Sequence, residues 1–262
     1  MIEEPLFDTH VHTALSPDSE MPPEVAIDTL NKLGLGCIFT EHVDMNPQGE
    51  LYFSADTEVY FREYTKFKSP TVKMGLEFGL TVECAEICRE IASNPLLDYC
   101  LGSVHIVDGL DIGCDPTYLE TVDDEVYRRY LDYMLENVKA NDYIDVLGHI
   151  DYISRYSPFA EKNVIYENYV DEYDRLLKEL VQRDIVLELS TKRLDDESAC
   201  KNLATIYQRY KNLGGRYVTI GSDAHLSSRL GYKFDVALVM INEIGLTPCY
   251  FRERRMVVCT QI

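Results

Sequence analysis

Short apolar runs alternate with amphipathic segments along the chain, and this alternation limits the folds available to it. Seven runs have strand character: Leu6–His12, Gly36–Thr40, Thr71–Glu77, Tyr99–His105, Tyr143–His149, Ile185–Ser190 and Arg216–Ser222. Helical patterns follow them: Pro23–Leu33, Thr57–Lys68, Thr81–Ser93, Asp123–Lys139, Val164–Arg183, Asp196–Leu213 and Lys233–Ile244. Successive strand–helix units predict an α/β fold with a parallel sheet, and their regularity favours a closed barrel over a doubly wound sheet.

The organisation of the chain favours a single domain. Its 262 residues would suit one large α/β domain or two small ones, but no segment has the composition of a linker. We therefore expect one domain over residues 1–262. The last segment carries Arg252, Arg254 and Arg255, and for such a charge run we expect a solvated strand or tail without an assigned function.

The chain is strongly acidic, with 45 Asp and Glu against 25 Lys and Arg and a formal net charge of −20. Such a surface repels the phosphates of nucleic acids and anionic lipids, so we expect neither as a partner. An anionic substrate would need local positive charge from metal ions or arginines.

The cellular location is predicted from the cysteines and from the distribution of apolar residues. The eight cysteines form no CxxC pair, and several lie in apolar runs, which favours a reducing cytoplasm. The sequence Met1–Pro5 does not resemble a signal peptide, and no apolar stretch is long enough to span a bilayer. We therefore expect neither export nor membrane insertion.

All six histidines lie at or just past the carboxyl end of a predicted strand: His10, His12, His42, His105, His149 and His225. Active sites of βα barrels form at this end, because the loops there converge on the barrel axis. A single histidine in such a place usually has a packing or solubility role. Six in the same place indicate a metal-binding active site.

The spacing of these residues suggests how they converge. Side chains at positions i and i+2 of a strand share a face, so Asp8, His10 and His12 can approach one cation, as can Asp223 and His225. Glu77 ends an apolar strand, where an ionised carboxylate is costly unless it is paired or metal-bound. We expect it to bridge two ions, with a salt bridge as the alternative.

The donor types restrict the metal. Mixed imidazole and carboxylate ligands suit Zn²⁺, Mn²⁺ or Fe²⁺, whereas a calcium site would be made of oxygen ligands. Six histidines exceed what one catalytic ion needs, so two or three divalent ions are expected.

Six short motifs occur in a fixed order: Asp8–Thr13 with Ser16 and Asp18, Thr40–His42, Gly75–Glu77, Ser103–His105, Gly148–His149 and Ser222–His225. In this order they resemble the motifs of the PHP (polymerase and histidinol phosphatase) family. The match runs from Asp8 to His225 and therefore covers most of the chain. The resemblance implies a distorted (β/α)7, TIM-like barrel that works as a metal-dependent phosphoesterase.

The resemblance also implies a set of ligands. It assigns one ion to His10, His12, Glu77 and Asp223, a second to Glu77, His105 and His149, and a third to His42 and His225 near Asp18. Asp18 stands where some relatives have a histidine. Asp8 is expected to orient His10 or His12, and Glu41 either has a similar role or is structural.

The chain has no polymerase or DNA-binding extension. In this it resembles the histidinol-phosphate phosphatases of histidine biosynthesis. Arg155 and Arg193 follow predicted strand ends, where a guanidinium group can bind phosphate oxygens; pairing with surface carboxylates is the alternative. The hypothesis is that metal-activated hydroxide attacks phosphorus and that the leaving alkoxide takes a proton from metal-bound water or from an adjacent acid such as Asp223 or His225.

Three other functions remain open. The first is hydrolysis of another small phosphate ester, such as a nucleotide or a sugar phosphate. The second is an amidohydrolase-like C–N hydrolase, although no lysine at a strand end is a candidate for the bridging residue that many of these enzymes use. The third is a non-catalytic metal-binding protein. The sequence leaves the oligomeric state undetermined.

Overall fold

The computed structural model describes residues 4–46, 48–113 and 123–260. Parallel strands follow one another in the order β1 (Phe7–Val11), β2 (Gly36–Met45), β4 (Val72–Gly79), β5 (Tyr99–Ser103), β8 (Val146–Leu147), β9 (Val186–Ser190) and β10 (Tyr217–Gly221). Beyond β10, the backbone N–H of His12 donates to the carbonyl of Ala224 at 3.0 Å, so β1 also lies beside the end of β10. The predicted distorted (β/α)7 barrel is confirmed.

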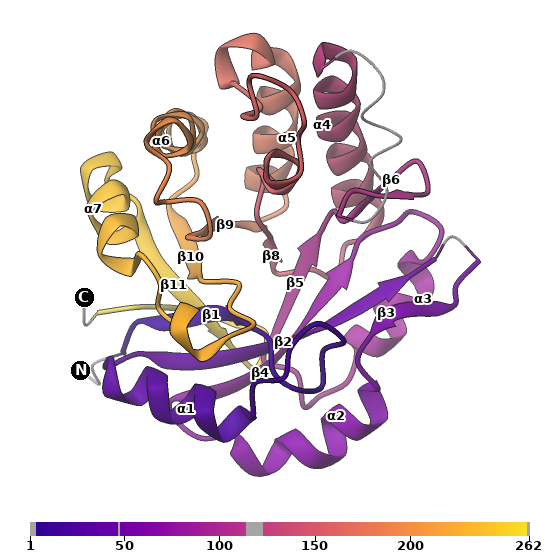
Figure 1. The fold of residues 1–262 in the computed structure, drawn as a ribbon, viewed down its shortest axis with the longest axis vertical. Helices are drawn as coiled ribbons and strands as arrows, with labels where there is room; N and C mark the ends of the chain where they lie inside the picture. Colours follow the sequence, from indigo (N-terminus) through magenta and orange to yellow (C-terminus); the bar gives the residue numbers. More distant parts are fainter. Residues whose placement is uncertain (1–3, 47, 114–122, 261–262) are drawn as a thin grey trace.

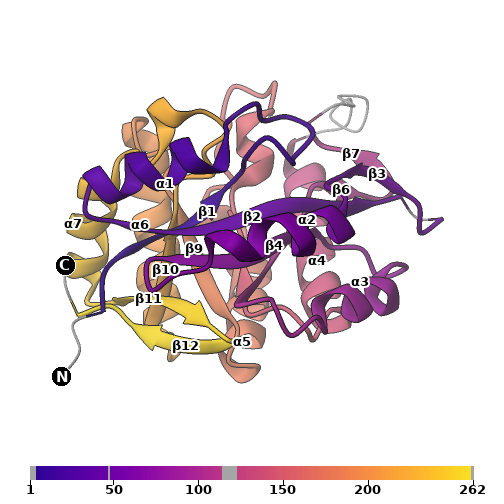
Figure 2. The same cartoon turned by 90° about the horizontal axis from the view of Figure 1, so that it is seen from below.

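The helices lie around the outside of the strands (Figure 1, and Figure 2 from below). They are α1 (Pro23–Lys32), α2 (Thr57–Tyr64), α3 (Ala85–Ala92), α4 (Asp123–Ala140), α5 (Val170–Gln182), α6 (Glu197–Asn212) and α7 (Phe234–Ile244). The side chains of Asp56 and Asp196 accept hydrogen bonds from backbone N–H groups in the first turns of α2 and α6. Gly245, with φ of 79°, ends α7 in the left-handed conformation that glycine adopts without strain.

Short strands lie next to the barrel strands, and of these only the last segment was expected to contain a strand. β3 (Leu51–Ser54) pairs with the unexpectedly long β2, and β6 (Ile106–Val107) pairs with β7 (Leu110–Asp111). β11 (Thr247–Arg252) and β12 (Arg255–Val258) form an antiparallel pair after α7. These strands are short and several are partly exposed, so they lack the continuous apolar runs by which a buried strand is recognised.

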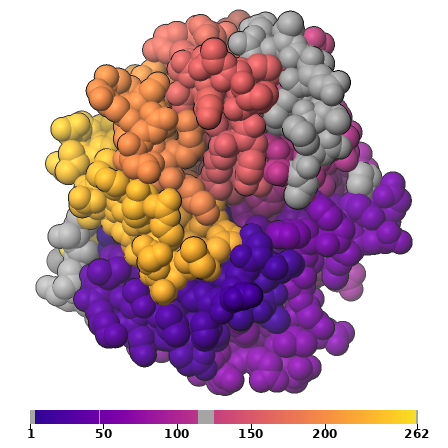
Figure 3. All heavy atoms as spheres, in the orientation of Figure 1, coloured from indigo at the N-terminus to yellow at the C-terminus, as the bar shows by residue number. Residues whose placement is uncertain are grey.

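The barrel is distorted where its first and last parts meet. β11 pairs with the first residues of β10, Tyr217 and Val218, whereas β1 meets the chain just past the carboxyl end of β10. The ring of Phe7 stacks on Tyr250 of β11, with centroids 4.0 Å apart. The indigo N-terminal part accordingly packs against the yellow C-terminal part (Figure 3). This closure brings the motif around His10 next to the motif around Asp223.

The arginines near the end of the chain differ in their surroundings. Arg254, in the turn between β11 and β12, donates hydrogen bonds to the Asp145 carboxylate at 2.7 and 3.1 Å and to the Ala92 carbonyl at 3.1 Å. Arg255 is exposed. The expectation of a solvated segment therefore fails for Arg254, because its guanidinium joins the last hairpin to the segments before β5 and β8.

The cysteines pack mainly as small apolar side chains. Six of the described cysteines are buried and Cys200 is partly buried, while Cys114 lies outside the described residues. Within the described ranges, no helix has both the length and the apolar composition that crossing a bilayer requires.

We predict that Arg254→Ala lowers the free energy of unfolding by about 2 kcal/mol, because it leaves the largely buried Asp145 carboxylate without its guanidinium partner. Chemical denaturation monitored by circular dichroism measures this change. Arg255→Ala is the control, since it removes an exposed arginine from the same hairpin and should change stability by less than about 0.5 kcal/mol. Equal stability of the two variants would contradict the proposed role of Arg254.

Candidate metal centre

Glu77, the buried carboxylate near the end of β4, lies at the centre of the histidine cluster. Its Oε2 atom lies 3.3 Å from Nε2 of both His10 and His12. Its Oε1 atom lies 3.0 Å from Nε2 of His149 and 3.3 Å from Nε2 of His105. Oε2 also lies 3.1 Å from Nδ1 of His42. The two oxygens therefore face different groups of imidazoles, as expected of a carboxylate that bridges two ions.

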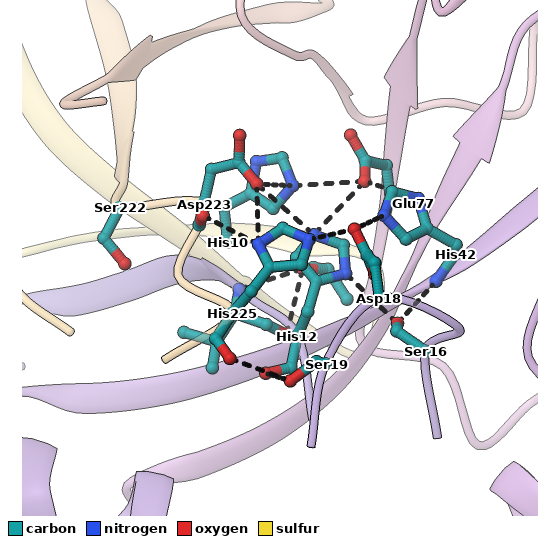
Figure 4. Close-up of polar contacts among 12 residues, drawn as sticks. His10, His12, Ser16, Asp18, Ser19, His42, Glu77, Ser222, Asp223 and His225 are labelled. Carbon is teal, nitrogen blue, oxygen red and sulfur yellow. Dashed lines mark hydrogen bonds and ion pairs between the residues drawn. The ribbon is translucent and has the colours of Figure 1, made fainter. Parts of the chain in front are cut away.

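The first predicted ligand group comes together from both ends of the chain. His10 lies in β1, His12 follows directly after β1, and Asp223 follows β10. Asp223 Oδ1 lies 3.9 Å from His10 Nε2 and 3.6 Å from His12 Nε2. Figure 4 shows these side chains directed toward one another and toward Glu77.

The third predicted group is also assembled. The His12 ring stacks against both His42 and His225, with both centroid distances at 4.2 Å. Asp18 Oδ2 lies 2.7 Å from His225 Nε2 and 3.7 Å from His42 Nε2. The structure thus brings all nine predicted ligands into one cluster: His10, His12, Asp18, His42, Glu77, His105, His149, Asp223 and His225.

Buried polar atoms at the centre of the cluster provide a test of fit for metal ions. His10 Nε2, His12 Nε2 and Glu77 Oε2 are inaccessible to solvent and have no hydrogen-bond partner among the described residues. Leaving such atoms unpaired costs about 1–3 kcal/mol each. Their convergence, with mixed nitrogen and oxygen donors, fits a transition-metal ion such as zinc, manganese or iron.

The ionisation of the central carboxylates favours cation binding. Burial alone would raise the pKa of Glu77, but the imidazoles of His10, His105 and His42 hold that pKa well below its ordinary value. Burial likewise opposes ionisation of Asp223, but Arg155 and other nearby cations hold its pKa low. Both side chains are therefore carboxylates at neutral pH.

Asp223 has a strained backbone that its neighbours stabilise. Its φ of 52° lies in the left-handed region, which side chains other than glycine rarely adopt. Lys192 Nζ donates to the Asp223 carbonyl at 2.7 Å, and Arg155 Nη1 donates to Oδ2 at 2.5 Å. These contacts hold the Asp223 carboxylate toward the cluster.

Two buried carboxylates that contact the histidines were not predicted from the sequence. Glu188 Oε1 lies 2.8 Å from His10 Nδ1, and its Oε2 accepts a hydrogen bond from the His149 backbone N–H at 2.8 Å. Asp44 Oδ1 lies 2.8 Å from His105 Nδ1. A carboxylate on the second ring nitrogen fixes the tautomer and orientation of an imidazole ligand. The available signals were a glutamate within the apolar β9 and an aspartate two residues after His42.

Asp8 is linked to His10 through the backbone, because it accepts a hydrogen bond from the His10 N–H at 3.5 Å. Its carboxylate accepts hydrogen bonds at 2.9 Å from the backbone N–H groups of Ser222 and Gly231, so it joins β1 to the segment after β10. Burial raises the pKa of Asp8 to about 6, despite these hydrogen bonds. The carboxylate that contacts the Nδ1 atom of His10 is Glu188, which lies across the barrel interior.

Glu41 combines the two roles considered for it. It accepts hydrogen bonds from the hydroxyls of Thr13 at 2.5 Å and Ser16 at 2.6 Å, both in the loop after β1. Ser16 Oγ in turn lies 3.2 Å from His12 Nδ1. Glu41 therefore stabilises the first loop and, through Ser16, orients His12.

A cavity of about 310 Å³ opens above the cluster. Arg155 and Lys192 line it, together with most of the predicted metal ligands. Arg193 is not among its lining residues; it donates hydrogen bonds to Asp151 at 2.9 Å and Asn163 at 2.7 Å. The structure therefore supports a phosphate contact for Arg155, whereas the contact predicted for Arg193 has no support from this geometry.

Many amidohydrolase-like enzymes use a lysine that bridges their metal ions. Lys73 is a buried lysine within β4, but its Nζ donates to the carbonyls of Ser69 at 2.6 Å and Pro70 at 2.9 Å, at the amino end of the strand. Lys73 thus lies at the opposite end of β4 from Glu77, and it cannot bridge ions at the cluster.

Comparison with known proteins agrees with this site. The family model of the PHP domain matches residues 8–192. This chain belongs to the PHP family. A probable histidinol-phosphatase of Clostridium acetobutylicum is 43% identical over 251 residues, which cover 96% of this PHP chain and 98% of that relative. A histidinol-phosphatase of Lactococcus lactis is 28% identical over 247 residues and is matched over 91% of each chain.

A solved structure extends the likeness beyond the matched range of the family model. The crystal structure of the Lactococcus lactis histidinol phosphate phosphatase, complexed with zinc, L-histidinol and phosphate, superposes with a TM-score of 0.88 at 27% identity. The match covers 97% of this PHP chain and 99% of that one. The shared fold therefore includes the segment with Asp223 and His225.

We predict that Glu188→Gln weakens metal binding roughly tenfold to hundredfold, because an amide cannot replace the carboxylate charge next to His10. Metal content after dialysis against graded chelator concentrations, measured by elemental analysis, gives the change. Glu243→Gln, an exposed substitution on α7, serves as the control and should retain its metal. Unchanged metal retention in a folded Glu188→Gln protein would show that Glu188 does not support the cluster.

Proposed function

We propose that this chain is a metal-dependent histidinol-phosphatase, which hydrolyses L-histidinol phosphate to L-histidinol and phosphate in histidine biosynthesis. The observation that carries the proposal is the cluster around Glu77, which lies beneath a cavity that also contains Arg155 and Lys192. The relatives matched over nearly the whole chain are named for the same activity. We further propose that residues 1–262 form one domain, since the barrel needs β1 and β10 side by side.

We propose three positions for the divalent ions. One lies between His10, His12, Glu77 and Asp223, a second lies between Glu77, His105 and His149, and a third lies near His42, His225 and Asp18. Asp18 belongs to this proposal because its carboxylate approaches both imidazoles. Zinc is favoured by the zinc complex of the Lactococcus lactis enzyme, and manganese and iron also suit these donors.

When bound, the ions would supply Lewis-acid activation of water and neutralise charge on the phosphoryl group. The residues of the chain have separate tasks. Arg155 is fixed by Asp223 and by Ser190, whose Oγ lies 3.3 Å from Nη2, and it can donate to a phosphate oxygen. Lys192 adds a second positive charge at the same side of the cavity.

The leaving alkoxide needs a proton, and we propose His225 as the donor when its ring nitrogen is not coordinated to the third ion. Two residues were candidates, Asp223 and His225, and both line the cavity. Arg155 holds the pKa of Asp223 well below its ordinary value, against the effect of burial. Asp223 therefore has no proton to donate at neutral pH and is a poor general acid. Asp223 thus has a role in binding a metal ion and in orienting Arg155.

The substrate is a small phosphate ester, which the size of the cavity supports. The net charge of −20 supports the absence of a nucleic-acid partner. The cytoplasmic location stays a prediction.

We predict that the protein releases phosphate from L-histidinol phosphate, and that a chelator abolishes this release. His10→Ala should lose activity to the same extent, because it removes a donor from the centre of the cluster. A phosphate-release assay before and after chelation, with metal added back, tests both points. Cleavage of an aryl phosphate without cleavage of L-histidinol phosphate would move the assignment to another phosphate ester. Bound metal without any hydrolysis would favour a non-catalytic protein.

We predict that Arg155→Met lowers kcat/KM for L-histidinol phosphate by roughly a hundredfold, because it removes a preorganised donor to the phosphoryl oxygens. Steady-state kinetics measures the loss, and elemental analysis checks that the variant retains metal. Arg183→Met removes an exposed guanidinium from the end of α5 and provides the control. An Arg155→Met protein with full metal content and unchanged kinetics would refute this role.

A further inference from the structure

Among the described carboxylates outside the proposed ligand set, Asp44 alone lies within ion-pair distance of two histidine rings. Its Oδ1 atom lies 2.8 Å from Nδ1 of His105, and its Oδ2 atom lies 3.3 Å from Nδ1 of His42. The two histidines belong to different proposed ion positions, His105 to the second and His42 to the third. Asp44 Oδ2 and His42 Nδ1 are both inaccessible to solvent, so water cannot replace their contact.

The register of the strands explains how one side chain reaches both rings. Asp44 lies two residues after His42 in β2, so the two side chains leave the strand on the same face. β4 lies between β2 and β5 (Figure 1), and its last residue, Gly79, pairs with Ser103 of β5. His105 follows Ser103 by two residues. The Asp44 carboxylate must therefore cross β4 to contact His105.

Gly79 provides the space for this crossing. A Cβ atom at this position would overlap with Oδ1 of Asp44 and would lie 2.7 Å from its Cγ. The backbone of Gly79 does not itself require glycine, because its φ is not positive. The missing side chain at the end of β4 is therefore explained by the neighbouring carboxylate, which has a fixed and closely packed place in the structure.

The contacts of Asp44 leave the opposite ring nitrogens available to metal ions. His105 Nε2 lies 3.3 Å from Glu77 Oε1. His42 Nε2 lies 3.7 Å from Asp18 Oδ2. A carboxylate that accepts the Nδ1 proton fixes the tautomer in which Nε2 has a free lone pair. Glu77 Oε2 also lies 3.1 Å from His42 Nδ1, but this oxygen is a proposed metal ligand, so Asp44 is the acceptor for the Nδ1 proton.

Glu188 supports a different part of the cluster. It lies in β9, and its carboxylate contacts Nδ1 of His10 and the backbone N–H of His149. Its contact with an imidazole ring is therefore made at the first proposed ion position, to which His10 belongs. The two buried carboxylates orient different rings, Glu188 at the first position and Asp44 at the second and third.

We propose that Asp44 is a positioning residue that orients His105 and His42 together, so that the second and third ion positions depend on one carboxylate. The inference rests on the proposed function, because it uses the three ion positions proposed there. Binding of the ion between His10, His12 and Asp223 does not depend on Asp44, because Glu188 orients His10.

The test removes the charge of Asp44 and counts the ions that remain. Asp44→Asn keeps the shape of the side chain, but its amide offers one acceptor oxygen to two rings. The metal-free protein is titrated with Zn²⁺ in a calorimeter, and elemental analysis after dialysis gives the number of bound ions. The number of tightly bound ions should fall to one, because affinity at the second and third positions drops roughly tenfold to hundredfold. The affinity for the remaining ion should change little.

Two further variants separate positioning from other effects. Gly79→Ala retains Asp44 and every proposed ligand, but the new Cβ displaces the Asp44 carboxylate, so this variant should lose the same ions as Asp44→Asn. Asp28→Asn makes the same exchange at an exposed site of α1, and this matched control should bind zinc like the unmodified protein. Circular dichroism of the metal-free proteins checks that each variant is folded.

Activity at different zinc concentrations provides an independent readout. At limiting zinc, turnover of L-histidinol phosphate by Asp44→Asn should be roughly tenfold lower than that of the unmodified protein, because fewer sites are filled. At saturating zinc, kcat and KM should both recover, because Asp44 acts through the imidazole ligands and not on the substrate. A defect in folding would not be reversed by zinc in this way.

Three results would overturn the inference: zinc binding by Asp44→Asn equal to that of the unmodified protein, an equal loss of affinity for all its ions, or a raised KM that persists at saturating zinc. The zinc titration does not depend on the substrate. Failure of the proposed function would appear instead as absence of L-histidinol phosphate turnover by the unmodified protein, although it binds zinc. The two failures therefore give different patterns.

Discussion

The active-centre geometry depends on the burial of Glu77 among imidazoles. An isolated ionised carboxylate inside a barrel would be strongly destabilising, so its charge must be balanced by nearby cations. Imidazoles from the ends of β1, β2, β5 and β8 surround it, and each is within hydrogen-bonding or ion-pair distance. Bound divalent ions would provide this balance and would link segments that are distant in the sequence, so that metal binding and folding support each other.

Polar residues that contact the histidines hold the cluster in its orientation. Glu188 and Asp44 each contact the ring nitrogen of a histidine on the side away from Glu77, and Ser16 connects Glu41 to His12. These partners are buried, so their hydrogen bonds are not exchanged with water and they restrict rotation of the rings. The imidazole rings of the site are therefore preorganised by buried polar residues around them.

Much of the site could be predicted because strand ends are recognisable in the sequence. The parallel barrel was predicted from repeated strand–helix units, and parallel strands bring their carboxyl ends to one face. His10, His105 and His149 could therefore be expected to meet without knowledge of their partners. The carboxylates that contact the histidine rings from outside the cluster could not be predicted in the same way. Glu188 contacts His10 across 178 positions of sequence, and only the closure of the barrel brings the two residues together.

What the sequence determined by itself is the set of donors and the end of the barrel at which they gather, since both follow from strand periodicity and residue chemistry. The tertiary structure decided which of these donors lie next to one another. It also decided which arginine side chain lines the cavity. Arg155 and Arg193 looked equivalent in sequence, yet Arg155 lines the cavity while Arg193 is bound to Asp151 and Asn163. The physical reason is that a long side chain pairs with the carboxylate its loop brings within reach, and loop paths depend on packing that local sequence patterns do not encode.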